Sequence, residues 1–449
     1  MINRLFKSME ISNIIFILIA IAAVVFFAKN LKTIIRNINL GKDLDISDNK
    51  SDRWKKMFLV AVGQSKMVKK PVSGLLHIVV YVGFIIINVE VLEIIIDGIF
   101  GTHRFFASFL GPLYNVLIFS FEWLAFLVLI ACVIFLIRRN ILKIKRFGLK
   151  EMLGWPKTDA NIILIAEVLL MGAFLTMNAS DYLLQEMNAD HYVNAGSFPI
   201  CETLIAPLMD GFSMSTLILI ERATWWFHII GIFAFLNYLP YSKHFHILLA
   251  FPNVYFSKLR PKGQFTNMES VQKEVAMMFD PEADPYAAPA EPVGEPERFG
   301  VKDVTDLSWK NLMDAYSCTE CGRCTQQCPA NITGKLLSPR KVMMDTRDRL
   351  EEVGKNIDTH GKDFTDGKSL LGDYISEEEL WACTTCNACV EACPVGIDPL
   401  SIIVDMRRSL IMEDSKAPSE LTSMLSNIEN NGAPWQFATN DRLNWRDEN

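Results

Sequence analysis

Two stretches of similar sequence, SCTECGRCTQQCPA at residues 317–330 and ACTTCNACVEACPV at residues 382–395, decide the fold of the second half of this chain. Each contains four cysteines in the order C-x2-C-x2-C-x3-C, and a proline follows the fourth. This spacing predicts two [4Fe–4S] clusters, because three thiolates surround one cluster while the fourth reaches across to the other. Structural zinc favours paired C-x2-C units instead and does not call for eight cysteines in this repeat.

The crossed arrangement assigns each thiol to a cluster. We assign the first cluster to Cys318, Cys321, Cys324 and Cys393. We assign the second cluster to Cys383, Cys386, Cys389 and Cys328. Eight of the ten cysteines lie within residues 318–393, whereas a secreted disulfide scaffold is short and spreads its cysteines throughout. We therefore expect metal binding in a reducing compartment.

Helix signals surround the cysteine runs. Pro339 follows Ser338 at the start of a stretch of good helix formers, and Ser376 precedes three glutamates. Proline is favoured at the first position of a helix, serine caps the N-terminus, and acidic side chains suit the first turn. We therefore predict a mostly helical iron–sulfur domain at residues 308–415.

The first half of the 449-residue chain is much more apolar. Overall, 50% of the residues are hydrophobic and only 21% are charged, which argues against a purely soluble enzyme. Apolar runs long enough to cross about 30 Å of hydrocarbon lie at about 11–28, 73–97, 113–137, 160–178 and 214–241. We predict a five-span transmembrane helix bundle at residues 1–260, with the first span retained as an anchor.

The loops between the spans predict the orientation. Residues 29–70 contain 11 Lys or Arg and residues 138–158 contain 7, whereas residues 98–112 contain one and residues 179–213 contain none. Positively charged loops stay on the cytoplasmic side of a membrane. We therefore expect the N-terminus outside and the iron–sulfur domain in the cytoplasm, at a bacterial inner membrane.

Four of the seven histidines lie in or beside the second and fifth spans, namely His77, His228, His244 and His246. Ionisable groups in a bilayer are costly and usually functional, although hydrogen-bonded or interfacial histidines are the alternative. Haem iron between helices needs two imidazoles at one depth. His77 lies about 9 Å inside its span at roughly 1.5 Å per residue, the level at which the fifth span ends. We predict one haem b there, bound by His77 and by His246 in preference to His244.

A second haem at the outer level lacks one ligand. His228 and His246 are separated by about five helical turns, so an unbroken helix would place both on one face, although Pro240 can kink it. The second span has no histidine at the depth of His228. We keep His228 as a candidate ligand without a partner.

Carboxylates also lie inside the predicted spans, namely Glu90, Glu93, Glu122 and Glu167. Quinone reduction takes up two protons, which such a carboxylate can carry, but a polar contact between helices is an equally good explanation. The sequence assigns neither role. His103 and His191 fall in predicted outer loops, where we expect them to be solvated.

The membrane half resembles a known cytochrome family. A histidine on the second of five spans, together with His228 and His246 at their five-turn separation on the fifth, is similar to the di-haem cytochrome b subunit of respiratory nitrate reductase. Membrane anchors of heterodisulfide reductases are similar as well. In that family the second span carries two histidines ten residues apart, whereas the position ten after His77 is Ile87. The resemblance supports the inner haem b and leaves the outer one without its second ligand.

The second half has its own resemblance. Through the cysteine runs and Leu337-Ser338-Pro339-Arg340, residues 308–412 resemble the α-helical ferredoxin domain of heterodisulfide reductase, succinate dehydrogenase and glycolate oxidase iron–sulfur subunits. The CCG module of that family requires two adjacent cysteines, and this sequence has none. The resemblance implies a separate CCG-type iron–sulfur partner, which the tail at residues 416–449 would contact. It also implies an electron-transfer flavoprotein or a flavin dehydrogenase as the electron donor.

Together these patterns predict an oxidoreductase subunit of the heterodisulfide reductase type. It would pass electrons between a cytoplasmic donor and quinone, with substrate chemistry on the partner chain and its own catalytic residues unidentified. Residues 261–307, rich in Pro, Ala and Glu, would link the two domains. The alternative is an iron–sulfur membrane anchor or redox sensor without haem. We expect membrane lipid as a further partner, and no nucleic acid.

Overall fold

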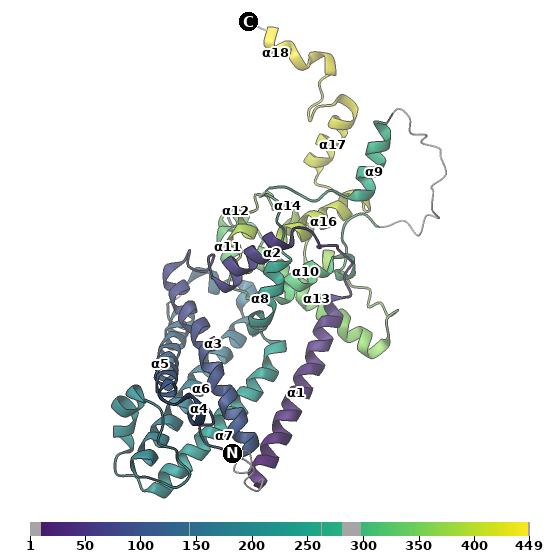
Figure 1. The fold of residues 1–449 in the computed structure, drawn as a ribbon. Coiled ribbons are helices and arrows are strands. Elements are labelled where there is room, and N and C mark those ends of the chain that lie inside the picture. Colours follow the sequence, from purple (N-terminus) through teal and green to yellow (C-terminus); the bar gives the residue numbers. More distant parts are fainter. Residues whose placement is uncertain (1–9, 143, 262, 281–297, 448–449) are drawn as a thin grey trace.

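The computed structural model describes residues 10–142, 144–261, 263–280 and 298–447 (Figure 1). Residues 281–297, within the predicted linker, lie outside the described residues. In the described part every regular element is a helix, and the only β contacts are two isolated bridges. The all-α class predicted from the sequence is therefore confirmed.

Five helices are long and apolar enough to cross a membrane, as predicted. They are α1 (Ile11–Ile38), α3 (Pro71–Phe100), α5 (Pro112–Asn140), α6 (Trp155–Glu186) and α7 (Met214–Tyr238). At roughly 1.5 Å per residue, even the shortest exceeds about 30 Å of hydrocarbon, so the helices continue past the apolar runs. Proline stands in the first turn of α3, α5 and α6, where its missing N–H costs no helical hydrogen bond.

The fifth span ends sooner than an unbroken helix to His246 would require. α7 stops at Tyr238, and Pro240 lies in a tight 3-10 turn. Proline has no N–H to donate to the preceding turn, so it favours this break. His228 and His246 therefore do not share one continuous helix. The chain continues as 3-10 turns at Leu239–Tyr241 and Lys243–Phe245, and then as α8 (His246–Tyr255).

The second domain consists of helices around the two cysteine runs. They are α10 (Trp309–Tyr316), α11 (Arg323–Gln327), α12 (Pro329–Ile332), α13 (Pro339–His360), α14 (Glu377–Trp381), α15 (Ala388–Ala392) and α16 (Pro399–Met412). The predicted caps are present, because Ser338 accepts a backbone N–H of α13 and Ser376 forms a capping box with Glu379. The apolar core of this domain includes Ile34 of α1 and Phe245, so the two domains share buried surface.

The spans α3, α5, α6 and α7 pack in chain order, and α1 completes the bundle. Asn13 of α1 donates to the carbonyl of Gly98 near the outer end of α3, at 2.8 Å. Further in, α1 follows α7 instead, where Asn237 donates to the carbonyl of Ala23 at 3.2 Å. The last turns of α1 reach α10 and α13 of the second domain (Figure 1).

Charged contacts at one end of the bundle hold the two domains together. The fully buried Arg340 donates to Glu151 at 2.8 Å, and Lys243 forms an ion pair with Glu320. Two more exposed pairs join the domains, Lys69–Glu391 at 3.0 Å and Arg36–Asp358 at 2.7 Å. The segments that the charge pattern assigns to the cytoplasm thus lie against the iron–sulfur domain.

Besides α8 and the last short helix, Asn444–Asp447, four further α-helices of the described residues lie outside these two groups. They are α2 (Lys50–Met57), α4 (Ala107–Leu110), α9 (Glu269–Met278) and α17 (Ser419–Asn431). α17 and the final turn α18 (Asn444–Asp447) extend away from the body of the molecule (Figure 1).

Candidate functional site

The two cysteine runs fold in the same way. In the first run Glu320 and Gly322, on either side of the second cysteine, have φ of 52° and 71°. In the second run Thr385 and Asn387 stand at the matching positions, with φ of 55° and 60°. A residue in the left-handed conformation reverses the local direction of the chain, and only glycine and asparagine adopt this conformation readily. The repeat in sequence is therefore also a repeat in backbone conformation.

A short helix follows each of these loops and leads to the fourth cysteine. α11 and α15 pack against each other, and each gives way to an extended cysteine, Cys328 or Cys393, directly before a proline. The residue before proline disfavours the helical region, so the chain leaves the helix there. This turn carries the fourth thiol of each run away from the first three.

The structure brings the first predicted set of thiols together. Cys318, Cys321, Cys324 and Cys393 line one small cavity, which Cys389 also reaches. Burial raises the pKa of the Cys324 thiol, and the neighbouring Cys321, Cys318 and Cys393 raise it further. Thiols that oppose one another's ionisation in this way favour a bound cation that would stabilise the thiolates.

The second set is also crossed between the runs. Burial raises the pKa of Cys383, and Cys328 and Cys386 add to the effect. All ten cysteines, which lie within the described residues, are free thiols. Two sulfurs already accept backbone N–H groups, Cys383 from Thr385 at 3.4 Å and Cys393 from Ile397 at 3.3 Å. Soft thiolate donors with N–H groups aimed at sulfur fit an iron–sulfur cluster.

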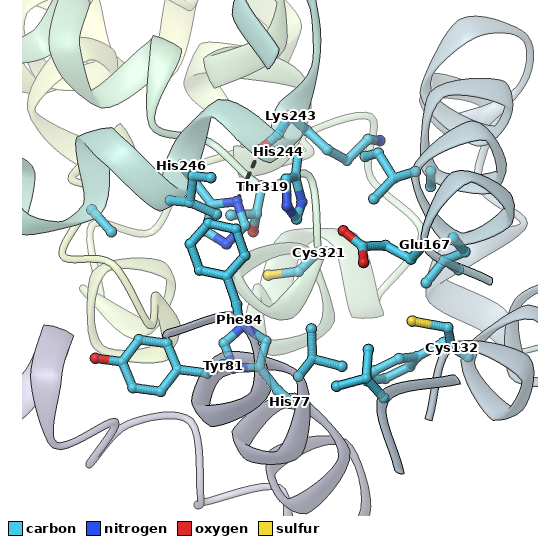
Figure 2. A pocket seen from close by; sticks show the side chains of 18 of the residues that line it. His77, Tyr81, Phe84, Cys132, Glu167, Lys243, His244, His246, Thr319 and Cys321 are labelled. Carbon is cyan, nitrogen blue, oxygen red and sulfur yellow. Dashed lines mark hydrogen bonds between the residues drawn. The ribbon is translucent and has the colours of Figure 1, made fainter. Parts of the chain in front are cut away.

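A larger cavity of about 500 Å³ lies next to the first set, between α3, α5, α6, α7 and α8 (Figure 2). All four candidate haem ligands line it, namely His77, His228, His244 and His246. Thr319 and Cys321 of the first cysteine run form part of its wall. Figure 2 shows His77 on one side of the space and His244 and His246 on the other, with Cys321 between them in this view.

The spacing of these rings suits one iron atom. The ring centroids of His77 and His246 are 6.5 Å apart, with the ring planes at 43°. A metal bound to two imidazole nitrogens at about 2 Å each would separate the centroids by roughly 6 Å. His244 stands nearly perpendicular to His246, at 86° and 5.6 Å. His77 and His246 thus remain the preferred pair.

Hydrogen bonds prepare two of the histidines as ligands. Nδ1 of His246 donates to the carbonyl of Lys243 at 3.0 Å, and Nδ1 of His228 donates to that of Leu170 at 3.0 Å. A carbonyl can only accept, so each Nδ1 carries the proton and each Nε2 is left as a lone-pair donor, as in most metal-binding histidines. Burial lowers the pKa of His244 to about 3 and also lowers that of His246, so both are neutral at physiological pH.

The part of the cavity next to the iron–sulfur domain is positively charged. Its lining includes Arg138, Arg139, Arg146, Lys243 and Arg323. The Nε atoms of Arg139 and Arg146 are buried and have no hydrogen-bond partner among the described residues. Haem carries two propionate carboxylates, which guanidinium groups bind well. The residues present therefore fit a haem whose propionates point towards the iron–sulfur domain.

The end of the cavity far from the iron–sulfur domain has one histidine, His228. His228 lies in the same cavity near Phe174, at a centroid distance of 5.7 Å. Ile87, ten positions after His77, is buried and lines the cavity with an aliphatic side chain. The described residues therefore supply no second imidazole for an outer haem.

The carboxylates of the spans serve different purposes. Glu93 accepts the N–H of Phe106 at 2.7 Å and the hydroxyl of Tyr114 at 2.8 Å, so it joins a loop to the bundle. Glu122 accepts the backbone N–H of Ile200 at 3.0 Å and so joins another loop to the bundle. One oxygen of Glu90 is buried without a partner among the described residues. Glu167 points into the histidine cavity (Figure 2).

Of the two histidines expected to be solvated in outer loops, His191 is exposed, whereas His103 is not, contrary to the expectation from the sequence. His103 is 9% exposed and lies 3.4 Å from the buried carboxylate of Asp181, which also pairs with Arg104. His191 packs against His103 with ring centroids 5.6 Å apart. The loop folds back over the bundle, and nothing in its own sequence signals this polar cluster.

The comparisons with known proteins agree with this architecture. The family model of a 4Fe-4S dicluster domain matches residues 317–397. A helical dicluster domain on five helices able to span a membrane defines a class of membrane-associated iron–sulfur protein, and the chain is a homologue of iron–sulfur oxidoreductases.

Three relatives make this class more specific. A probable iron-sulfur-binding oxidoreductase, FadF, of Bacillus subtilis is 30% identical over 97% of this chain and 61% of its own length. An EtfAB:quinone oxidoreductase of Syntrophomonas wolfei is 28% identical over 90% of this chain and 55% of its own. One chain of a CoB-CoM heterodisulfide reductase of Methanosarcina acetivorans is 33% identical over 24% of this chain and 52% of its own. The chain thus spans less than two thirds of each relative. No solved structure matches it.

Proposed function

We propose that this chain carries electrons between a cytoplasmic donor and the quinone pool of a bacterial inner membrane, through two [4Fe–4S] clusters and one haem b. One observation supports the proposal above the others. A single cavity is lined by His77 and His246 and also by Cys321 of the first cysteine set. A haem in this cavity would stand directly beside the first cluster, which a mere membrane anchor does not require.

The exposure of the cysteines suggests the order of the centres. Cys386, assigned to the second cluster, is exposed, whereas Cys318 and Cys393 of the first are buried. Electrons would enter at the second cluster, pass to the first and continue to the haem, or run in reverse. The iron centres supply one-electron steps when bound. The chain holds them by thiolate and imidazole and excludes water with its buried core.

The partners are part of the same proposal. One relative is named an EtfAB:quinone oxidoreductase, and both of the longest matches extend well beyond the length of this chain. In this proposal a CCG-type iron–sulfur subunit docks near the exposed Cys386 and the tail at residues 416–449. It would take electrons from an electron-transfer flavoprotein or another flavin dehydrogenase. The basic loops against the iron–sulfur domain support a cytoplasmic location for that domain, with the N-terminus outside.

The test is a reduced-minus-oxidised visible spectrum of the detergent-purified protein, with haem and iron measured per chain and a quinol as one reductant. We expect one haem b, reducible by quinol, and eight irons. His77→Ala and His246→Ala should each abolish the haem signal, while His360→Ala, at the end of α13 in the other domain, should retain it. Eight irons without haem in the unaltered protein would refute the proposal in favour of an iron–sulfur anchor or redox sensor.

A further inference from the structure

We propose that the deep end of the histidine cavity binds the head group of a quinone or quinol, between Glu167 of α6 and His228 of α7. The inference rests on the proposed function and names the site at which its quinone chemistry takes place. It starts from the length of the cavity, which extends from His77, near the first cysteine set, to His228 and Leu170.

Glu167 and His228 lie at the same depth. Glu167 stands about three helical turns after Trp155, where α6 begins, and His228 about three turns before Tyr238, where α7 ends. At roughly 1.5 Å per residue both are about 15–18 Å from the cytoplasmic ends of their helices. His77 is less than two turns into α3, so the two groups lie below the iron site. The wall around them is mainly aliphatic, formed by Ile87, Val91, Val128, Leu164 and Ile232.

Each of the two groups has an atom available for a ligand. Nδ1 of His228 is occupied by the carbonyl of Leu170 at 3.0 Å, which leaves Nε2 as an acceptor. Glu167 points into the cavity and forms no side-chain hydrogen bond with another described residue. A carboxylate and an imidazole nitrogen without partners among the described residues, in a cavity whose wall is otherwise apolar at this depth, indicate a ligand with two polar ends. The two oxygens of a quinone head group lie at opposite ends of its ring.

The cavity is accessible from the side that faces lipid. Phe84 and Ile85 line it and are also 43% and 51% exposed on a spanning helix. α1 contacts the outer end of α3 through Asn13 and Gly98, and no described residue of α1 is among those that line the cavity. A ligand can therefore enter from the hydrocarbon and leave an apolar tail there. This route favours a lipid-soluble ligand.

The two groups also suit the proton balance. When a quinol is oxidised, its two O–H bonds break, one proton passes to the Glu167 carboxylate and the other to Nε2 of His228. The two electrons leave one at a time to the haem and then to the clusters. Quinone reduction is the reverse, with Glu167 and the protonated His228 as the proton donors.

The test is the binding of a fluorescent quinol analogue, heptyl-hydroxyquinoline N-oxide, to the purified full-length protein with its cofactors. We expect one probe to be quenched per chain. Glu167→Gln and His228→Asn should each weaken binding about tenfold or more, because the first replaces a charge-assisted hydrogen bond by a neutral one and the second shortens the side chain away from the ligand. Haem content should stay unchanged in both. Glu93→Gln, a carboxylate that lines the separate outer cavity, is the matched control and should bind the probe normally.

The outcomes separate this site from the proposed function. Unchanged probe binding in both variants would overturn the site even if haem and quinol reduction are present. Loss of haem from His228→Asn would also overturn it, because His228 would then be an iron ligand. Tight probe binding that depends on Glu167 and His228 in a protein without haem would support the site and refute the haem route.

Discussion

The ion pair between Arg340 and Glu151 predicts how firmly the two domains are joined. Arg340 is fully buried, and its guanidinium donates to Glu151 at 2.8 Å and to the carbonyl of Arg146 at 2.9 Å. Glu151 also accepts the hydroxyl of Ser338, at 2.7 Å. Glu151→Gln keeps the size of the side chain but removes its charge. The variant therefore leaves a buried guanidinium without its counter-ion.

The magnitude follows from the burial of the pair. Removing one partner of a buried ion pair costs about 3–5 kcal/mol, and glutamine recovers part of this by accepting one hydrogen bond. We expect about 1–3 kcal/mol of lost stability for the iron–sulfur domain. The matched control is Asp358→Asn, which disrupts the exposed Arg36–Asp358 pair between the same two domains. An exposed pair contributes about 0–1 kcal/mol.

The assay is denaturant unfolding of the holoprotein in detergent, followed by cluster absorbance, together with the rate of electron transfer between clusters and haem. Glu151→Gln should retain both cofactors, unfold at lower denaturant and transfer electrons more slowly, because the docking of the domains is loosened. Arg340→Met combined with Glu151→Met should recover part of the stability, since a well-packed apolar pair replaces the buried charges. If Glu151→Gln and Asp358→Asn are equally stable, the reasoning is wrong.

Three further predictions concern the contact between the two domains and the first cysteine run. Burial alone would raise the pKa of Glu151, but hydrogen bonds from Ser338 and Arg340 outweigh it and lower the pKa. The contribution of Glu151 to stability is therefore fully present above the ordinary glutamate pKa of about 4.3. It is lost as the pH falls through the lowered pKa. The stability difference between the unaltered protein and Glu151→Gln should therefore shrink below about pH 4 in a titration of unfolding. Cys324→Ser should remove the paramagnetic resonance signal of one cluster and leave the haem spectrum intact; loss of both would mean that the two domains fold together. Gly322→Ala should cost about 1–2 kcal/mol, measured by the same unfolding assay, because a Cβ at φ 71° would also meet the guanidinium of Arg340.

The sequence predicted those features that depend on local repetition. The five spans follow from runs of apolar residues, and the caps at Ser338 and Ser376 follow from the residues next to them. The crossed cysteine sets were predicted from spacing, and the structure brings the same sets together, although bound iron remains a proposal. The spans and the caps are decided by residues close together along the chain, whereas the crossed cysteine sets join two distant runs and were predicted because the same spacing is repeated in both.

Features that depend on distant segments were not predicted. Glu122 appeared as a carboxylate in a span, and only the return of the chain to Ile200 gives it a backbone partner. His103 meets Asp181 in the same way, from a segment much earlier in the sequence. A hydrophobicity pattern records which face of a helix is buried but not which loop will cover it. The roles of Glu167 and of Arg340 likewise required the cavity and the domain interface to be known.

The break after α7 explains how the two halves reach one site. Because Pro240 ends the span, the next turn carries Lys243 and then His244 and His246 at the domain boundary. The carbonyl of Lys243 accepts a hydrogen bond from Nδ1 of His246. The ammonium group of Lys243 forms an ion pair with Glu320, which lies between two cysteines of the first set. Glu320 is held from the other side by Arg347 at 2.9 Å. One buried ion pair thus connects the histidine-bearing turn to the cysteine-bearing loop. A continuous helix through position 246 would lack this turn, so the helix break is what places the imidazole of His246 in the same cavity as Cys321 of the first cysteine set.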